Sequence, residues 1–337
     1  MAIRKATIAV SYRNSRTNKS YGLESRVEEV SLTDNAVGGE GDSIDITLYD
    51  KDHKMLGEYY PGKDDILSCT ISFKDSRGRA RVIGSQTFHV DQFGYSGSSK
   101  FTLRGISVPK NSEFSKTPKT KTWQNIYHWA IINQICKSYG LKLVYESGTF
   151  NPYLKKVEQS NTNDLSFIHN LAQTYGNGFK IYSDKVVVFP EENYEKKAAV
   201  GTIAKGDIIE DSFSARIDLI RQYTGYVYEY ANNKGGNTRR GVWFQTTPSI
   251  MIDVGFNDSE QIGIMKGRAK VNEANRDMEI INFSILGDPD MVSMATFNLS
   301  GFGGLNGKYY INKVVNNFSA SGGFTQDIEA RRIQQRL

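Results

Sequence analysis

The side chains best suited to metal binding or proton transfer lie far apart in this chain. Zinc ligands usually come in pairs a few residues apart, and a catalytic histidine needs a partner within hydrogen-bonding reach. The spacing of the histidines and cysteines meets neither requirement, so we predict no metal site, no cofactor and no catalytic residue. These residues are His53, His89, His128, His169, Cys69 and Cys136.

The two cysteines give no disulfide framework. Cys69 stands in a strand-like run and Cys136 beside the apolar face of an expected helix. Buried free cysteines behave as small apolar residues, and free thiols are typical of a reducing compartment. We therefore expect both to be core residues of a chain made in a cytoplasm.

A glycine-rich segment, Gly301–Gly307, has the composition of a phosphate-binding loop. A dinucleotide-binding loop needs the pattern G-x-G-x-x-G, but Asn306 stands at the last glycine position. The following residues, Lys308–Ile311, are strand-like, whereas a phosphate loop leads into a helix. Asn306-Gly307 before a strand is a hairpin signal, so we predict a turn here.

Hydrolytic chemistry has weak support in the sequence. The G-x-S-x-G motif of serine hydrolases is absent. The chain has 37 Asp and Glu residues, and two of them could face each other across a cleft as in a glycosidase. A hydrolase therefore stays open as an alternative.

Basic residues gather in one stretch of a chain whose net charge is only +5. Between Arg104 and Lys121 there are five basic residues and one acid, with Lys116, Lys119 and Lys121 at the end of the stretch. Such a strip is either a solvated connector or a docking strip for an acidic neighbour or a phosphate backbone.

Three tyrosines, Tyr226, Tyr228 and Tyr230, alternate along an expected strand. Side chains two residues apart point to the same face of a strand, so the three rings share one face. That face is either a half-buried sheet surface or a subunit interface, where tyrosine is enriched.

The elements that position these residues alternate between β-rich and α/β regions. Short strand-like runs with Gly, Pro and Asp turns fill residues 1–108 and favour an antiparallel barrel. Residues 109–121 are a predicted linker, and 122–200 a small α/β domain. Residues 201–337 are β-rich again, with a helix-containing insertion at about 246–276. The predicted fold class is mainly β with α+β insertions.

Three helices are expected within these regions. The first is expected from Thr122 to Gly140, with Trp123 and Ile126 on its apolar face. The second is capped by Asn163 or Asp164 and stops before Gly176. The third is expected to start at Asp258 or Ser259. The expected strands Phe179–Tyr182 and Lys185–Phe189 form a hairpin after the second helix.

Two segments carry motifs that are more specific than composition. In the C-terminal part, Gly287-Asp288-Pro289 has the form of a Gly-x-Pro turn, and Gly307–Val314 has the form G-x-Y-x-I-x-x-V. The middle segment has the pattern D-x-x-F-x-x-x-L-A followed by Y-G. Together the motifs cover roughly residues 120–190 and 277–333 and resemble the phage late control protein D family. The matching middle residues are Ser160, Asp164, Phe167, Leu171, Ala172, Tyr175 and Gly176.

This resemblance implies a structural role. Proteins of that family are hubs of contractile tails, in which each chain contributes two barrels and three chains form a pseudo-sixfold ring. The implied partners are two further copies in a homotrimer, the tail tube or its initiator protein, the trimeric spike and the baseplate wedge proteins. The implied place is the baseplate of a virion or phage-tail-like particle, with DNA at most as cargo in the lumen.

Other classes remain open at this stage. A tail-tip peptidoglycan hydrolase and a carbohydrate- or nucleic-acid-binding β-protein are the alternatives to a hub. The N-terminus has no apolar run of signal-peptide length, and no apolar run reaches membrane-spanning length, so we expect no membrane segment. The sequence does not distinguish a phage from a bacteriocin or another injection particle.

Overall fold

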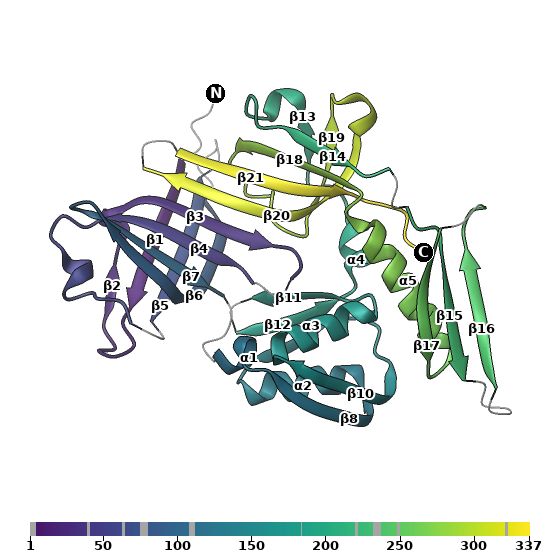
Figure 1. Ribbon diagram of the computed structural model, residues 1–337. Helices are drawn as coiled ribbons and strands as arrows, with labels where there is room; N and C mark the ends of the chain where they lie inside the picture. The colour runs from purple at the N-terminus through teal and green to yellow at the C-terminus, as the bar shows by residue number, and fades with distance from the viewer. Residues whose placement is uncertain are drawn as a thin grey trace.

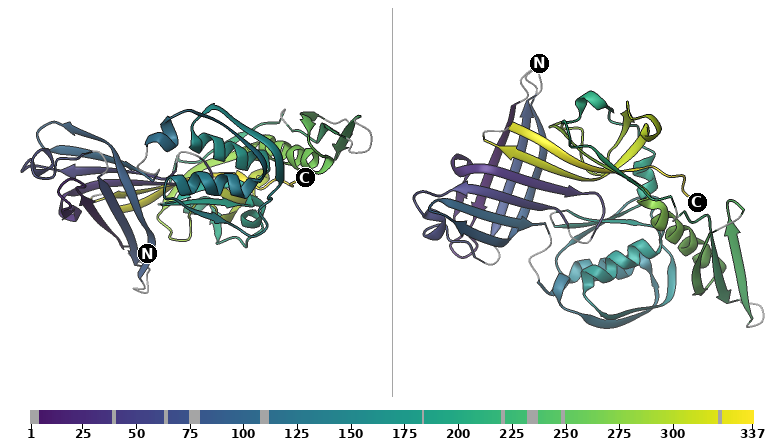
Figure 2. Two further views of the ribbon diagram at one scale, coloured as in Figure 1. Left: turned by 90° about the horizontal axis from the view of Figure 1, so that it is seen from below. Right: turned by 45° about the horizontal axis from the view of Figure 1, so that its top comes forward.

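The computed structural model describes residues 5–38, 41–62, 65–74, 80–107, 112–182, 184–219, 222–231, 237–247, 250–320 and 323–337. Strands contain 51% of the residues and helices 20%, which confirms the prediction of a mainly β fold. The molecule is elongated, with the N-terminal strands at one end and strands β15–β17 at the other (Figure 2).

One large sheet runs through both β-rich regions (Figure 1). Its N-terminal strands, which we call the first β region, are β1 (Lys5–Arg13), β2 (Ser20–Gly22), β3 (Val27–Asn35), β4 (Ser43–Tyr49), β5 (Ile66–Lys74), β6 (Ala80–Ser96) and β7 (Lys100–Ile106). Its C-terminal strands, the second β region, are β13 (Thr202–Ala204), β14 (Ser214–Ile217), β18 (Glu279–Leu286), β19 (Thr296–Ser300), β20 (Gly307–Ser319) and β21 (Gly323–Arg332).

The two regions are joined by antiparallel pairing of β3 with β20, from Asn35 opposite Lys313 to Glu29 opposite Ser319. The strand order is β14-β18-β21-β20-β3-β4-β7-β6-β5-β1-β2, with β19 on β20 and β13 on β19. Each region keeps its own apolar core. Pairing among the described strands forms an open path, so closure of each region into a separate barrel stays a prediction.

A small α/β unit follows the first β region. It consists of α1 (Ser112–Lys116), β8 (Lys119–Tyr127), α2 (His128–Ser138), β9 (Lys142–Tyr145), β10 (Tyr153–Thr162), α3 (Asp164–Thr174), β11 (Gly178–Tyr182), β12 (Lys185–Phe189) and α4 (Glu191–Glu195). Helices α2 and α3 lie between a β8–β10 ribbon and a sheet of order β11-β12-β9 (Figure 1). The described part of the predicted linker 109–121 therefore contains α1 and the start of β8. The domain boundaries themselves stay predictions.

The prediction of a helix starting at Thr122 was wrong, because residues up to Tyr127 belong to strand β8. Asn125 has φ +50°, and the pairing with β10 skips this position. The left-handed backbone at Asn125 lets both Trp123 and Ile126 pack on the inner side at a spacing of three, which imitates a helical pattern. Trp123 is buried and stacks on Phe167 of α3 at 5.0 Å.

Predictions for the middle segment were confirmed. Asn163 caps α3 by accepting a hydrogen bond from the backbone N–H of Ser166 at 2.8 Å. Gly176 ends the helix with φ +75°, a conformation that glycine adopts without strain. The hairpin of β11 and β12 lies where the alternation placed it, although part of its turn is outside the described residues.

A separate sheet, which we call the tyrosine sheet, forms the far end of the molecule. It contains β16 (Thr238–Phe244), β15 (Gly225–Ala231) and β17 (Met251–Asn257) in that order, and α5 (Glu260–Arg276) covers one face. The third predicted helix is confirmed, since Ser259 caps α5. Short 3₁₀ turns elsewhere lie at Glu24–Arg26, Lys54–Leu56, Lys205–Asp207 and Gly303–Leu305.

The three tyrosines of β15 share one face, as predicted, and that face packs against α5. Tyr226 and Tyr228 are only 1% and 5% exposed. Their rings fit against Gly267 and Gly263, where an added Cβ would come within 2.1 Å and 2.3 Å of the ring carbons. The subunit-interface interpretation is therefore corrected for these two residues, because their own chain already covers them.

We expect Gly267→Ala to lower the free energy of unfolding by about 1–3 kcal/mol, because the new methyl group overlaps the Tyr226 ring and overpacking is destabilising. The higher helix propensity of alanine opposes this loss by less than about 1 kcal/mol. Urea unfolding measures the change. Gly206→Ala is the matched control, since an added Cβ there meets nothing within 4 Å. Equal stability of the two variants would contradict the packing argument.

Candidate functional site

A largely buried lysine joins three parts of the fold, and we call its surroundings the Lys180 junction. Lys180 lies on β11 of the small α/β unit, Asp34 on β3 of the first β region, and Ser293 before β19 of the second. The Lys180 Nζ lies 2.6 Å from Asp34 Oδ1 and 3.1 Å from Ser293 Oγ. Ser293 also donates its backbone N–H and its hydroxyl to Asp34, at 2.9 Å and 2.6 Å. One ammonium group thus holds three segments that are far apart in the sequence.

Asp42 is the fourth member of the junction and is fully buried. Its Oδ1 lies 3.6 Å from Lys180 Nζ and accepts the backbone N–H of Asn35, while its Oδ2 accepts the side-chain amide of Gln86. Burial raises the pKa of Asp42 to about 6, although Lys180 lowers it in opposition. Burial alone would lower the pKa of Lys180, but Asp34 and Asp42 outweigh that effect and its pKa is raised.

A second buried group of charges, the arginine cluster, ties α4 to α5 and to the C-terminal segment. Glu191 and Glu195 lie one turn apart on α4. Arg331 Nη2 lies 2.6 Å from Glu195 Oε1, and Arg336 Nη2 lies 2.8 Å from Glu191 Oε2. Arg276, the last residue of α5, reaches Glu191 Oε1 at 3.3 Å. The cluster therefore anchors the helix that covers the tyrosine sheet.

The carboxylates of the arginine cluster are held in the charged form. Burial alone would raise the pKa of Glu191, but Arg276, Arg331 and Arg336 outweigh it, so its pKa lies below the ordinary value. The pKa of Glu195 is lowered in the same way, against its burial. A general acid needs a carboxyl group that is protonated near neutral pH, so these two residues are poorly suited to acid catalysis.

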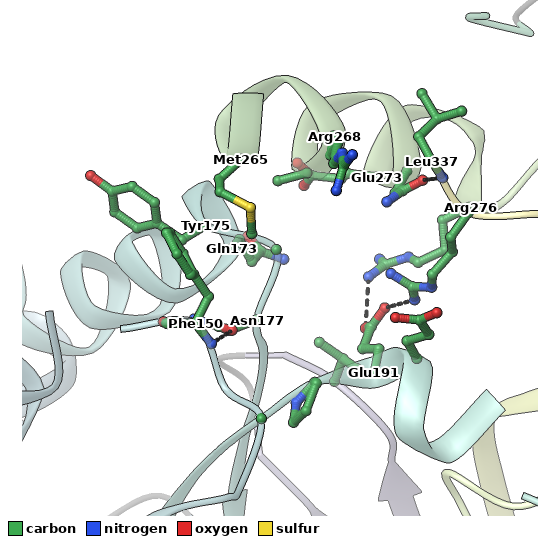
Figure 3. A pocket seen from close by; sticks show the side chains of 18 residues that line it. Phe150, Gln173, Tyr175, Asn177, Glu191, Met265, Arg268, Glu273, Arg276 and Leu337 are labelled. Carbon is green, nitrogen blue, oxygen red and sulfur yellow. Dashed lines mark hydrogen bonds and ion pairs between the residues drawn. The ribbon is translucent and has the colours of Figure 1, made fainter. Parts of the chain in front are cut away.

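An open pocket of about 220 Å³ lies beside the arginine cluster (Figure 3). Phe150 and Tyr175 lie on one side of it, and Met265 and Arg268 extend from α5. Asn177 fixes the position of Phe150 through hydrogen bonds to its backbone N–H and carbonyl. The cations and carboxylates of the lining are balanced, so the pocket has the character of a packing space between units rather than a reactive centre.

The predicted basic strip is divided in the structure. Lys116 and Lys121 are exposed, and the Lys121 Nζ lies 4.6 Å from the centroid of the Trp123 ring. Lys119 instead bonds Asp164 at 2.8 Å and the Tyr139 hydroxyl at 2.6 Å. The ammonium group of Lys119 is therefore already bonded within the chain. A docking role stays a prediction for Lys116 and Lys121.

His128, Cys69 and Cys136 are all buried. His128 is buried, with Nδ1 3.0 Å from the Tyr145 hydroxyl and Nε2 3.2 Å from the Leu171 carbonyl. Burial lowers its pKa to about 4, although the Leu171 carbonyl acts in the opposite direction. Burial raises the pKa of both Cys69 and Cys136 to about 12. Across the described residues no three potential ligands gather as a metal site, and no described helix has the length and apolar character to span a membrane.

Sequence reasoning missed both buried ionic groups. The available signal at Lys180 was a single charge within the apolar strand Gly178–Tyr182. On α4, Glu191 and Glu195 at a spacing of four indicated a shared helix face. Neither pattern reveals the partners, which come from segments more than 80 positions away along the chain.

We expect Lys180→Met to lower the free energy of unfolding by about 3–5 kcal/mol at pH 7, because buried Asp42 loses its cation and must either stay charged without a partner or take up a proton. The loss should be smaller at pH 5. Asp42 already has a raised pKa, and removal of Lys180 raises it further, so the carboxyl group becomes neutral as the pH falls. Urea unfolding at the two pH values measures both effects.

The control for this variant is Lys196→Met, which breaks the exposed pair with Glu192 and should change stability by less than about 1 kcal/mol. Adding Asp42→Asn to Lys180→Met should restore part of the loss and remove most of its pH dependence. A loss that is the same at both pH values would contradict the assignment of Asp42.

Comparison with known proteins finds likeness in structure alone. No family model and no curated protein sequence matches the chain. A tail protein from Neisseria meningitidis MC58 matches with a TM-score of 0.68 over 97% of both chains, at 12% identity. The prophage tail protein gp18 of Listeria monocytogenes EGD-e matches with a TM-score of 0.66 over 97% of this chain and 95% of that one, at 15% identity.

A structure with a lower TM-score also has a fold of this kind. An Escherichia coli protein, described as a component of the type VI secretion system with structural similarity to the T4 tail proteins gp27 and gp5, matches with a TM-score of 0.56 at 10% identity. The match covers 92% of this chain and 74% of that one. The chain therefore has the fold of phage tail proteins from end to end, and at these identities the likeness concerns the fold.

Proposed function

We propose that this chain is a structural protein of the tail of a phage or a related contractile injection particle. The observation that carries the proposal is the fold likeness to tail proteins over 97% of the chain. We further propose the hub position, in which a homotrimer forms a pseudo-sixfold ring between the hexameric tail tube and the trimeric spike. The late control protein D motifs of residues 120–190 and 277–333 support this position.

The internal construction of the molecule supports a mechanical role. The pairing of β3 with β20 makes the two β regions parts of one sheet, and the Lys180 junction fixes the small α/β unit against both. Breaking a buried ion pair by losing one partner is costly, so relative movement of these units is resisted. A chain that transmits force between a tube and a spike needs such resistance.

The surface of the tyrosine sheet that faces away from α5 supports a role in an assembly. Val242, Phe244 and Phe256 share that face, and each is more than half exposed. Exposed apolar patches on a folded chain are typical of surfaces that other molecules cover. The proposed partners are further copies of the chain, the tail tube or its initiator, the spike and the wedge proteins. DNA enters the proposal at most as cargo in the lumen.

We propose that the role is not enzymatic. The paired carboxylates of α4 are neutralised by arginines, and His128 is enclosed by a carbonyl and a tyrosine. The proposed place of action is the baseplate of a particle that is assembled in a bacterial cytoplasm. The proposal covers phages, prophages and phage-tail-like bacteriocins alike.

We expect the purified chain, mixed with the spike and tube proteins of its own gene cluster, to form a complex that contains three copies of the 37.9 kDa chain. Native mass spectrometry measures the copy number, and electron microscopy of the complex tests for a ring. Lysis of purified cell walls by the chain alone is the parallel assay for a hydrolase. A chain that stays monomeric with both partners present would overturn the hub proposal, and cell-wall lysis would overturn the non-enzymatic one.

The exposed lysines give a separate prediction. We expect Lys116→Glu with Lys121→Glu to weaken binding of an acidic tail partner and to make its salt dependence shallower, because fewer ionic contacts form. Co-sedimentation with the assembled particle across a salt series measures this. Lys137→Glu with Lys142→Glu is the matched control, because these lysines are exposed on the same unit. If both double variants show the same salt dependence, the strip has no docking role.

A further inference from the structure

The Lys180 junction holds a lysine and an aspartate in contact beside a second carboxylate. The side chains of Lys180 and Asp34 are 12% and 16% exposed, and that of Asp42 is fully buried. The Lys180 Nζ lies 2.6 Å from Asp34 Oδ1, and Asp42 Oδ1 lies 3.6 Å from the same nitrogen. One ammonium group thus faces two carboxylates, so an ion pair alone leaves one of them without a cation of its own.

The contacts of Asp34 are those of an acyl group prepared for attack. Ser293 donates its backbone N–H to Asp34 Oδ2 at 2.9 Å and its hydroxyl to Oδ1 at 2.6 Å. Donors fixed in this way stabilise the negative oxygen of a tetrahedral intermediate in acyl transfer. The hydrogen bond from Nζ to Oδ1 keeps the nitrogen close to Cγ, and attack needs these two atoms to be about 3–3.5 Å apart. An amine, an acyl carbon and donors for its oxygen therefore meet at one point.

Asp42 is suited to carry protons between these groups near neutral pH. Burial raises its pKa to about 6, although Lys180 acts in the opposite direction. The backbone N–H of Asn35 and the side-chain amide of Gln86 fix its carboxylate. The charged groups that face it are Lys180 on β11 and Asp34 on β3. A proton carrier works best when its pKa lies near the working pH, and Asp42 meets that condition.

We propose that Lys180 and Asp34 condense to an isopeptide bond, with Asp42 as the proton carrier. The ammonium group passes one proton to Asp34 Oδ1 across their hydrogen bond, and the neutral amine then attacks Cγ. The backbone N–H of Ser293 stabilises the charge that forms on Oδ2. Asp42 takes a second proton from the nitrogen and returns it to Oδ1. The bond from Cγ to Oδ1 then breaks and one water leaves, so the step needs no oxidant, reductant or further reactant.

The bond joins the small α/β unit covalently to the first β region, across 146 positions of the chain. It replaces the ion pair by a neutral amide, and Asp42 can then hold a proton without opposition from a cation. The reaction occurs once in each chain and has no external substrate, so it is a modification rather than an enzymatic activity. The proposal goes beyond the structural role in a tail and does not depend on it, because every group belongs to a single chain.

Mass spectrometry of the whole chain tests the proposal. The purified chain is expected to be lighter than its sequence by one water molecule, and proteolysis should yield a branched peptide that links Asp34 to Lys180. Lys180→Arg keeps a cation beside both carboxylates but cannot form the amide, so it should have the full mass. Asp42→Asn should lower the linked fraction by about tenfold or more, because the proton carrier is lost. Circular dichroism checks that each variant is folded.

A second lysine–aspartate pair in the same chain is the matched control. The Lys119 Nζ lies 2.8 Å from Asp164 Oδ2, a contact similar to that in the junction. The other contacts of this carboxylate are the Tyr139 hydroxyl and the Gln159 amide, so no second carboxylate stands beside it to carry protons. This pair should stay unlinked. A branched peptide at Lys119 would contradict the need for a second carboxylate.

Three results would overturn the proposal. They are the full mass in the unchanged chain, loss of water without a branched peptide between Asp34 and Lys180, and complete linkage in Asp42→Asn. The unchanged chain is measured without any substitution, so its mass and its peptides decide whether the bond forms even where a variant does not fold.

Discussion

One largely buried ammonium group links the small α/β unit to both β regions. Lys180 leaves the small α/β unit and reaches Asp34 of the first β region and Ser293 of the second, and buried Asp42 lies on its other side. The backbone repeats the connection, since Gly38 donates to the carbonyl of Phe179 at 3.0 Å. Without the cation, Asp34 and buried Asp42 would lose the positive charge that they share. The lysine therefore favours this placement of the small α/β unit against the two β regions.

The buried charges favour one placement of the units over others more than they add to the stability of the fold. Taking ions out of water costs several kcal/mol for each, and their mutual attraction roughly offsets that loss only when the geometry is right. A displaced unit would lose the attraction and keep the penalty. The arginine cluster acts in the same way. There, ion pairs from Glu191 and Glu195 hold the end of α5 beside the end of β21. Apolar cores give each unit its stability, and the β3–β20 pairing and the two ionic groups together favour one placement of the units.

Local structure was predictable wherever the deciding interaction is local. The cap at Asn163, the stop at Gly176 and the hairpin of β11 and β12 each depend on neighbours within a few residues. The start of the first helix was not predictable from spacing, because the left-handed backbone at Asn125 changes a strand period of two into an interval of three between Trp123 and Ile126. The Lys180 junction was also not predictable from the sequence. Its partners lie 113 and 146 positions away, and no periodicity links them.

The three tyrosines of β15 show where sequence reasoning about surfaces fails and what would have corrected it. Alternation places the rings on one face but does not say what covers that face. Gly263 and Gly267 are four residues apart on α5, so they open one strip of the helix surface, and bulky rings fit only against such a strip. A strand with aromatic residues on one face, followed closely by a helix with small residues four apart, therefore predicts that the two surfaces pack together in the core. The face of this sheet that is available for contacts with other molecules is the one that points away from α5, where Val242, Phe244 and Phe256 are exposed.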